Sequence, residues 1–112
     1  MEKLLNNKEL AGFLRTIKEL LSKGKFDFVP RRKNLASLAE YGLSIQDVKD
    51  VIVELEFNNY FKGPKEDFDR PGLIWEFKTQ IESNVFYIKL KVTKEGESQI
   101  LKCLSFHKSD FD

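Results

Sequence analysis

The residues with the clearest chemical potential lie in the second half of the chain, where apolar and polar residues alternate. Segment 85–92, VFYIKLKV, alternates most regularly. Because successive side chains of a β-strand point to opposite faces, its polar residues share the face directed away from the core. The same alternation in the neighbouring segments predicts one sheet face that combines a carboxylate, a phenol, an imidazole and several ammonium groups: Glu76, Lys78, Tyr87, Lys89, Lys91 and His107.

This set of side chains suits metal-free cleavage of a phosphodiester bond in RNA. The reaction needs a base for the 2′-hydroxyl proton, an acid for the departing 5′ oxygen, and cations that stabilise the charge on the phosphorane. His107 can be the acid or the base, since histidines titrate near neutrality, and Glu76 can be the base. The candidates for holding the phosphate, orienting it or stacking on a base are Lys62, Lys89, Lys91 and Tyr87.

Ordinary structural roles also account for these residue types. Lysines such as Lys89 and Lys91 are common on the solvated face of a sheet, where they prevent aggregation or pair with a carboxylate. A single histidine is an ordinary surface residue. The basic run that includes Arg31 and Arg32 is either a solvated turn or a phosphate contact. Cys103 reads as a small sheet residue, because the chain has no second histidine to activate a thiol.

Helical periodicity in the first half predicts elements that support this sheet. Apolar residues recur at spacings of three and four from Leu10 to Leu21, which predicts a helix that ends at Gly24. The next segment, residues 25–34, alternates briefly until Pro30 interrupts it. It is expected to form one short edge strand.

Two further short helices are expected before the sheet. The first is predicted to be capped by Asn34 and to end at Gly42. Its apolar side is Leu35, Leu38 and Ala39. The second begins where Ser44 and Asp47 resemble a capping box. The pair resembles a DNA-binding helix-turn-helix, but the acidic residues of the second helix would repel phosphate.

The rest of the chain is predicted to be one long loop and three strands. Residues 58–72 read as a loop because they contain glycines, prolines and mixed charges. The three expected strands lie in 73–81, 85–92 and 101–107. In the last of these, Leu104 is expected to face the core with Phe106, which directs Cys103 outward, and Leu101 also falls on the outer face.

Length and composition predict a single domain over residues 1–112. The expected class is α+β, with N-terminal helices packed on one face of a small, mainly antiparallel C-terminal sheet. Hydrophobic residues make up 41% of the chain, so a core is expected without disulfides. One cysteine and one histidine cannot build a structural zinc site, and no cofactor is predicted.

Charge and hydropathy give an expectation about location and partners. We recognise no signal peptide, and no apolar stretch reaches the ~20 residues that span a bilayer. A cytoplasmic protein without a membrane partner is therefore expected. The formal net charge of +1 argues against tight, non-specific binding of nucleic acid.

Six stretches occur in a fixed order between about Ile17 and His107: KGKFDFVPRRKN, EYGLSIQDVKDVIVEL, NNYFKGP, IWEF, VFYIKLKV and CLSFH. Together they resemble the MqsR family of bacterial toxin–antitoxin toxins, in the RelE-like group of messenger-RNA interferases. The resemblance implies a RelE-like fold and an endoribonuclease that cleaves mRNA with or without the ribosome. It also implies a cognate antitoxin that keeps the enzyme inactive.

The resemblance implies roles for individual residues. Lys62 matches the family's lysine after an aromatic pair, and Tyr87 and Lys89 match its Tyr-x-Lys strand. Glu76 stands where the family often has glutamine, and His107 where the best-known members carry lysine. The catalytic candidates are therefore Lys62, Glu76, Tyr87 and His107. The candidates for RNA binding are Lys89, Lys91, Arg31 and Arg32.

Two functions fit these residues. One is a toxin that cleaves single-stranded mRNA without metal to a 2′,3′-cyclic phosphate and a 5′-hydroxyl. Glu76 and His107 would then form an acid–base pair, with either residue as the base. The other is a non-catalytic module that binds RNA or a protein on the same sheet face.

Overall fold

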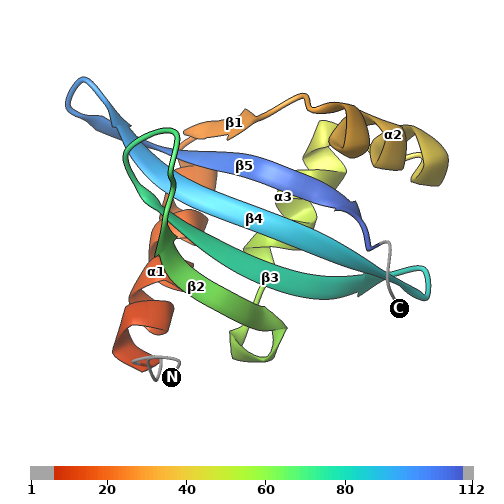
Figure 1. The fold of residues 1–112 in the computed structure, drawn as a ribbon, viewed down its shortest axis with the longest axis horizontal. Coiled ribbons are helices and arrows are strands. Elements are labelled where there is room, and N and C mark those ends of the chain that lie inside the picture. The colour runs from red at the N-terminus through yellow and green to blue at the C-terminus, as the bar shows by residue number, and fades with distance from the viewer. Residues whose placement is uncertain (1–6, 110–112) are drawn as a thin grey trace.

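The computed structural model describes residues 7–109, which form three α-helices and one five-stranded sheet (Figure 1). The helices are α1 (Asn7–Ser22), α2 (Arg32–Tyr41) and α3 (Ile45–Val53), and a short 3-10 helix, η1, spans Phe57–Asn59. The strands are β1 (Phe26–Phe28), β2 (Tyr60–Glu66), β3 (Leu73–Ile81), β4 (Asn84–Glu95) and β5 (Ser98–Lys108).

The strand order is β1-β5-β4-β3-β2, and only the β1–β5 pair is parallel within the described residues. Figure 1 shows α1 and α3 behind the sheet, and α2 beside one end of β5. The predicted class, α+β with helices on one face of a mainly antiparallel sheet, is confirmed.

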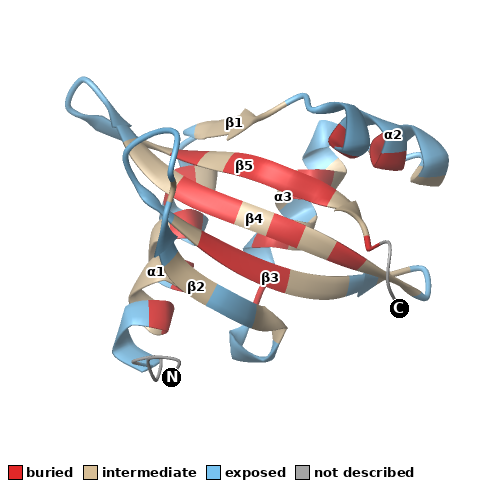
Figure 2. Cartoon of the chain, viewed as in Figure 1, coloured by how far each residue is buried: buried red, intermediate tan, exposed pale blue. Residues whose placement is uncertain are grey.

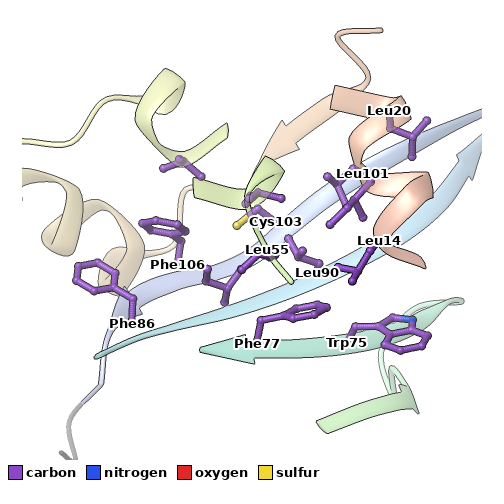
Figure 3. Packing of buried hydrophobic residues seen from close by; sticks show 14 of the residues in the cluster. Leu14, Leu20, Leu55, Trp75, Phe77, Phe86, Leu90, Leu101, Cys103 and Phe106 are labelled. Carbon is purple, nitrogen blue, oxygen red and sulfur yellow. The ribbon is translucent and has the colours of Figure 1, made fainter. Parts of the chain in front are cut away.

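The core lies between the sheet and the two helices behind it. Figure 2 shows the buried residues concentrated in the middle of β3, β4 and β5. The ring of Phe13 on α1 stacks on Trp75 of β3, with 4.6 Å between centroids. The predicted inward residues of β4 are confirmed, since Phe86, Ile88 and Leu90 are fully buried. Figure 3 shows Phe86 and Leu90 among the packed side chains of the core. Alternation along β3 would also direct Leu73 toward the core, on the same side as Trp75 and Phe77, but Leu73 is exposed.

Helix α2 is attached to β5 through a residue that the sequence assigned to another role. The N-cap of α2 is Arg31, so the prediction that Asn34 caps this helix was wrong. Asn34 is instead fully buried, and its amide donates to the carbonyls of Val29 (2.9 Å) and Leu104 (3.1 Å). Its Oδ1 accepts from the backbone N–H of Phe106 at 3.0 Å. One side chain therefore joins three backbone groups, one in the segment before α2 and two in β5.

The apolar side predicted for α2 is only partly correct. Leu38 is buried, but Leu35 and Ala39 are exposed. The buried side is more polar than expected, because it contains Asn34 and Ser37, whose hydroxyl accepts from the backbone of β5.

The capping box at the start of α3 is confirmed. The backbone N–H of Ser44 donates to Asp47 Oδ2 at 2.8 Å, and that of Asp47 donates to Ser44 Oγ at 3.0 Å. The hydrogen bond from the Ser44 backbone lowers the pKa of the Asp47 carboxyl. Behind this cap, Val48 and Ile52 enter the core.

Residues 60–66 form strand β2, so the predicted loop over 58–72 was wrong there. Its register against β3 shifts twice, because Tyr60 pairs with Phe77, Lys62 with Glu76 and Lys65 with Ile74. Each shift is a bulge that adds one residue to β2. A bulge interrupts the alternation of faces, which explains why the segment does not read as a strand.

Strand β5 contains a third bulge, at Leu104. Lys89 pairs with Ser105 while its neighbour Leu90 pairs with Cys103, which leaves Leu104 as the extra residue. The bulge reverses the predicted orientation of the first half of the strand. Cys103 and Leu101 lie in the core, and Leu104 lies on the opposite face, so these three predictions were wrong.

Candidate active site

The face of the sheet opposite α1 and α3 brings together the side chains that alternation predicted. Tyr87 of β4 pairs with Lys78 on β3 and with His107 on β5. One outward position further along β4, Lys89 pairs with Glu76 on β3. The candidate acid–base groups therefore flank β4, and since strands lie ~4.8 Å apart, the backbones of β3 and β5 are about 10 Å apart.

Both bulges of β2 direct side chains onto this face. Because the first bulge places one extra residue before Lys62, both Phe61 and Lys62 point outward. The second bulge does the same for Lys65. As a result, the ammonium groups of Lys65 and Lys62 lie 3.0 and 4.0 Å from Glu76 Oε2.

Glu76 is buried beneath these two lysines, with 4% of its surface exposed. Oε2 accepts no hydrogen bond from residues 7–109, so its interactions with the lysines are ion pairs without hydrogen-bond geometry. A buried carboxylate with cationic neighbours can orient them, or accept a proton once they move.

An aromatic cluster surrounds Tyr87. The ring of Phe61 lies 5.8 Å from that of Tyr87. Lys78 Nζ lies 3.8 Å from the centroid of Phe61 and 5.1 Å from that of Tyr87, which are cation–π distances. Phe61 and Lys65 were missed from the sequence, since both fall in the predicted loop. The only feature of the sequence that pointed to this segment was the aromatic pair directly before Lys62.

His107 is half-buried at the end of β5, with its ring 6.4 Å from that of Tyr87. Nδ1 lies 3.1 Å from the carbonyl oxygen of Lys108. In the tautomer that carries its proton on Nδ1, this hydrogen bond leaves Nε2 as the nitrogen that exchanges a proton with a ligand. The ring also lines a hollow of about 400 Å³ formed with α2.

Lys91 differs from the other candidates because only 2% of its surface is exposed. Its ammonium donates to Asp67 Oδ2 at 2.6 Å. This hydrogen bond lowers the pKa of the Asp67 carboxyl. Lys91 therefore holds the segment between β2 and β3 against the sheet, and could reach a phosphate only if this pair separated.

The remaining candidates are placed as follows. Arg31 and Lys89 both line a second, larger groove, whereas Arg32 is exposed and lines neither hollow.

Cys103 is buried, which raises the pKa of its thiol to about 12 and makes it a poor nucleophile. Among residues 7–109, no three His, Cys, Asp or Glu side chains are grouped so as to hold a metal ion.

Comparison with known protein families matches residues 12–108 to the family described as "motility quorum-sensing regulator, toxin of MqsA". The match covers most of the chain, including every candidate site residue. The chain belongs to the MqsR toxin family. The predicted resemblance is thereby confirmed, and the protein is a toxin of a toxin–antitoxin system.

Two further observations bear on this MqsR-family toxin. No curated protein matches the chain. In the part of the chain that the structure describes, no helix is long and apolar enough to cross a membrane.

Proposed function

We propose that this toxin is a metal-independent endoribonuclease that cleaves single-stranded mRNA to a 2′,3′-cyclic phosphate and a 5′-hydroxyl. The single observation that carries the proposal is the register of β2 to β5, which gathers acid–base and cationic groups on one open face. These groups are Lys62, Glu76, Tyr87, Lys89 and His107.

In the proposed mechanism the phosphate lies over β4, between the two acid–base groups. Glu76 takes the proton of the 2′-hydroxyl, and the freed oxygen attacks the adjacent phosphorus. The bond from phosphorus to the 5′ oxygen breaks, and charged His107 protonates that oxygen. Lys62 and Lys89 offset the charge of the phosphorane, and the Tyr87 hydroxyl orients it.

The substrate and setting follow from the same proposal. The toxin acts on mRNA in the cytoplasm, free or on the ribosome, and a cognate antitoxin controls it. The aromatic cluster of Phe61 and Tyr87 supports a single-stranded substrate, because unpaired bases stack on exposed rings.

One observation favours the alternative of a non-catalytic module that binds RNA or protein. The Glu76 carboxylate is covered by Lys62 and Lys65, so a 2′-hydroxyl reaches it only after these side chains move. Both lysine side chains are about half exposed, which leaves them room to do so.

The test is to incubate the purified toxin with end-labelled single-stranded RNA in the presence of EDTA. We expect products that end in a 2′,3′-cyclic phosphate. Loss of cleavage in EDTA would contradict the metal-free mechanism. RNA binding without products at any pH tested would favour the binding module instead.

A further inference from the structure

A groove of about 1010 Å³ extends the open face of the sheet beyond the candidate active site. Lys89 belongs to both the candidate active site and the groove, so the groove begins beside the proposed position of the phosphate. One wall is the segment between β2 and β3, residues 67–72, which Figure 1 shows crossing in front of the sheet. The opposite wall is formed by residues 29–31, before α2.

The lining of this groove carries more free cations than free carboxylates. Its basic residues are Arg31, Arg70, Lys89, Lys91, Lys94 and Lys102. Its acidic residues are Asp27, Asp67, Asp69 and Glu95.

Ion pairs neutralise only part of this lining. Lys91 pairs with Asp67, and Lys102 pairs with both Asp27 and Glu95. The four cations that form no ion pair with any described residue are Arg31, Arg70, Lys89 and Lys94. Asp69 is the only lining carboxylate without an ion pair to residues 7–109. The unpaired charge in the groove is therefore positive, which favours a polyanion.

The wall formed by residues 67–72 is held in place against the sheet. Besides the buried pair of Lys91 and Asp67, the side chain of Lys91 runs beneath Gly72. A Cβ atom at Gly72 would lie 2.9 Å from Lys91 Cδ, and the backbone there has a φ of +120°. The backbone N–H of Asp67 also donates to the Gly72 carbonyl at 3.2 Å. A fixed wall gives the groove a defined shape before any ligand binds.

Phe68 belongs to the segment that forms this wall and is 100% exposed, but it is not itself among the residues that line the groove. Its ring is therefore buried against nothing in residues 7–109, although both neighbours in the chain, Asp67 and Asp69, line the groove. Aromatic side chains beside basic grooves stack on the bases of single-stranded nucleic acid, whatever the sequence.

We propose that the groove holds the single-stranded RNA segment next to the cleaved bond. Arg31, Arg70 and Lys94 contact its phosphates, and Phe68 stacks on one of its bases. This inference rests on the proposed function, because the continuity at Lys89 is what places the segment beside the reacting phosphate.

The test measures binding separately from cleavage. A fluorescein-labelled RNA of random sequence is 2′-O-methylated throughout, so that it has no nucleophile, and its Kd is measured by anisotropy at several salt concentrations. We expect Phe68→Ala to weaken binding about ten-fold, and Phe68→Trp to preserve it. Arg70→Ala should lower the slope of log K against log salt by about 0.7, the value for one lost single-strand phosphate contact.

Two matched controls lie outside the groove. Phe57→Ala removes another exposed phenylalanine, and Arg15→Ala removes an exposed arginine on α1. Neither should change the Kd or the salt slope. If Phe68→Ala and Arg70→Ala bind as the parent does, the inference is wrong, even if the parent cleaves RNA. If both weaken binding but the parent cleaves no unmodified RNA, the proposed endoribonuclease is wrong, and the groove binds single-stranded RNA without a cleaved bond beside it.

Discussion

Tyr87 and His107 are direct partners across the β4–β5 ladder, with 6.4 Å between ring centroids. The phenol and the imidazole therefore project from adjacent strands to the same side of the sheet. Their separation is fixed by backbone hydrogen bonds and does not depend on a loop. A single phosphate can contact both groups, which makes this pair the centre of the proposed site.

Removing the imidazole of His107 or the hydroxyl of Tyr87 should impair cleavage without unfolding the protein. We expect His107→Ala to lower kcat by about 10²- to 10⁴-fold, the usual contribution of a general acid or base. Tyr87→Phe should cost about ten-fold, because one hydrogen bond to a charged group is lost. Single-turnover cleavage of labelled RNA measures both. Tyr41→Phe, on a tyrosine that packs against Phe86, is the matched control and should cleave like the parent.

Glu76→Gln tests whether the carboxylate moves a proton or only orients lysines. The amide keeps the shape of the side chain and presents an oxygen to Lys62 and Lys65, but it carries no charge and is not a base. We expect a loss of about 10²-fold or more in kcat. Cleavage at the parental rate would instead assign Glu76 to positioning these lysines. Circular dichroism should show the same folded state in both proteins.

A substrate with sulfur in place of the departing 5′ oxygen identifies the acid. A thiolate is a much better leaving group than an alkoxide and needs little protonation, since thiols titrate near 8.5. We expect this substrate to restore cleavage in His107→Ala and not in Glu76→Gln. Rescue of Glu76→Gln alone would reverse the two roles. The measurement is the rate ratio of the sulfur and oxygen substrates for each variant.

The pair of Lys91 and Asp67 should make stability depend on pH in the acid range. The Lys91 hydrogen bond holds the pKa of Asp67 below its ordinary value of 3.8 in the folded state. Because the pKa of this carboxyl is lower in the folded than in the unfolded state, the ion pair stabilises the protein at pH values above the unfolded-state pKa. This stabilisation is lost as the pH falls through the folded-state pKa. Asp67→Asn should therefore destabilise the protein at neutral pH and progressively less below pH ~4.

Urea unfolding of Asp67→Asn and of the parent at several pH values measures this difference. Asp69→Asn is the matched control, because Asp69 forms no ion pair with any described residue. Its difference from the parent should stay nearly constant over the same pH range. A difference for Asp67→Asn that grew as the pH fell would contradict the assignment of this ion pair.

The elements that could be predicted from the sequence are those along which the spacing of apolar residues stays constant. The alternation around Phe86, Ile88 and Leu90 identified the buried side of β4 because a pleated strand allows no other arrangement. The capping box of Ser44 and Asp47 could also be predicted, because it depends only on two residues three positions apart. The catalytic candidates on β3, β4 and the end of β5 were placed on one face for the same reason.

The rest depended on contacts between segments distant in the chain. Whether Leu104 bulges is decided by its pairing with β4, and nothing in the residues near Leu104 expresses that pairing. Asn34 looks like a helix cap because asparagine often is one. Its actual partners on β5 are some 70 positions away. Phe61 and Lys65 were missed because β2 shows no single period.

The two bulges of β2 decide how many side chains this strand adds to the open face. Each bulge is one residue more on β2 than on β3, so deleting Phe61 would make the strand regular there and leave Lys62 paired with Glu76. The lysines around Glu76 would keep their places, but the open face would lose the ring that lies 5.8 Å from Tyr87. A relative one residue shorter here could therefore keep the cluster around Glu76 and still lack half of the aromatic pair.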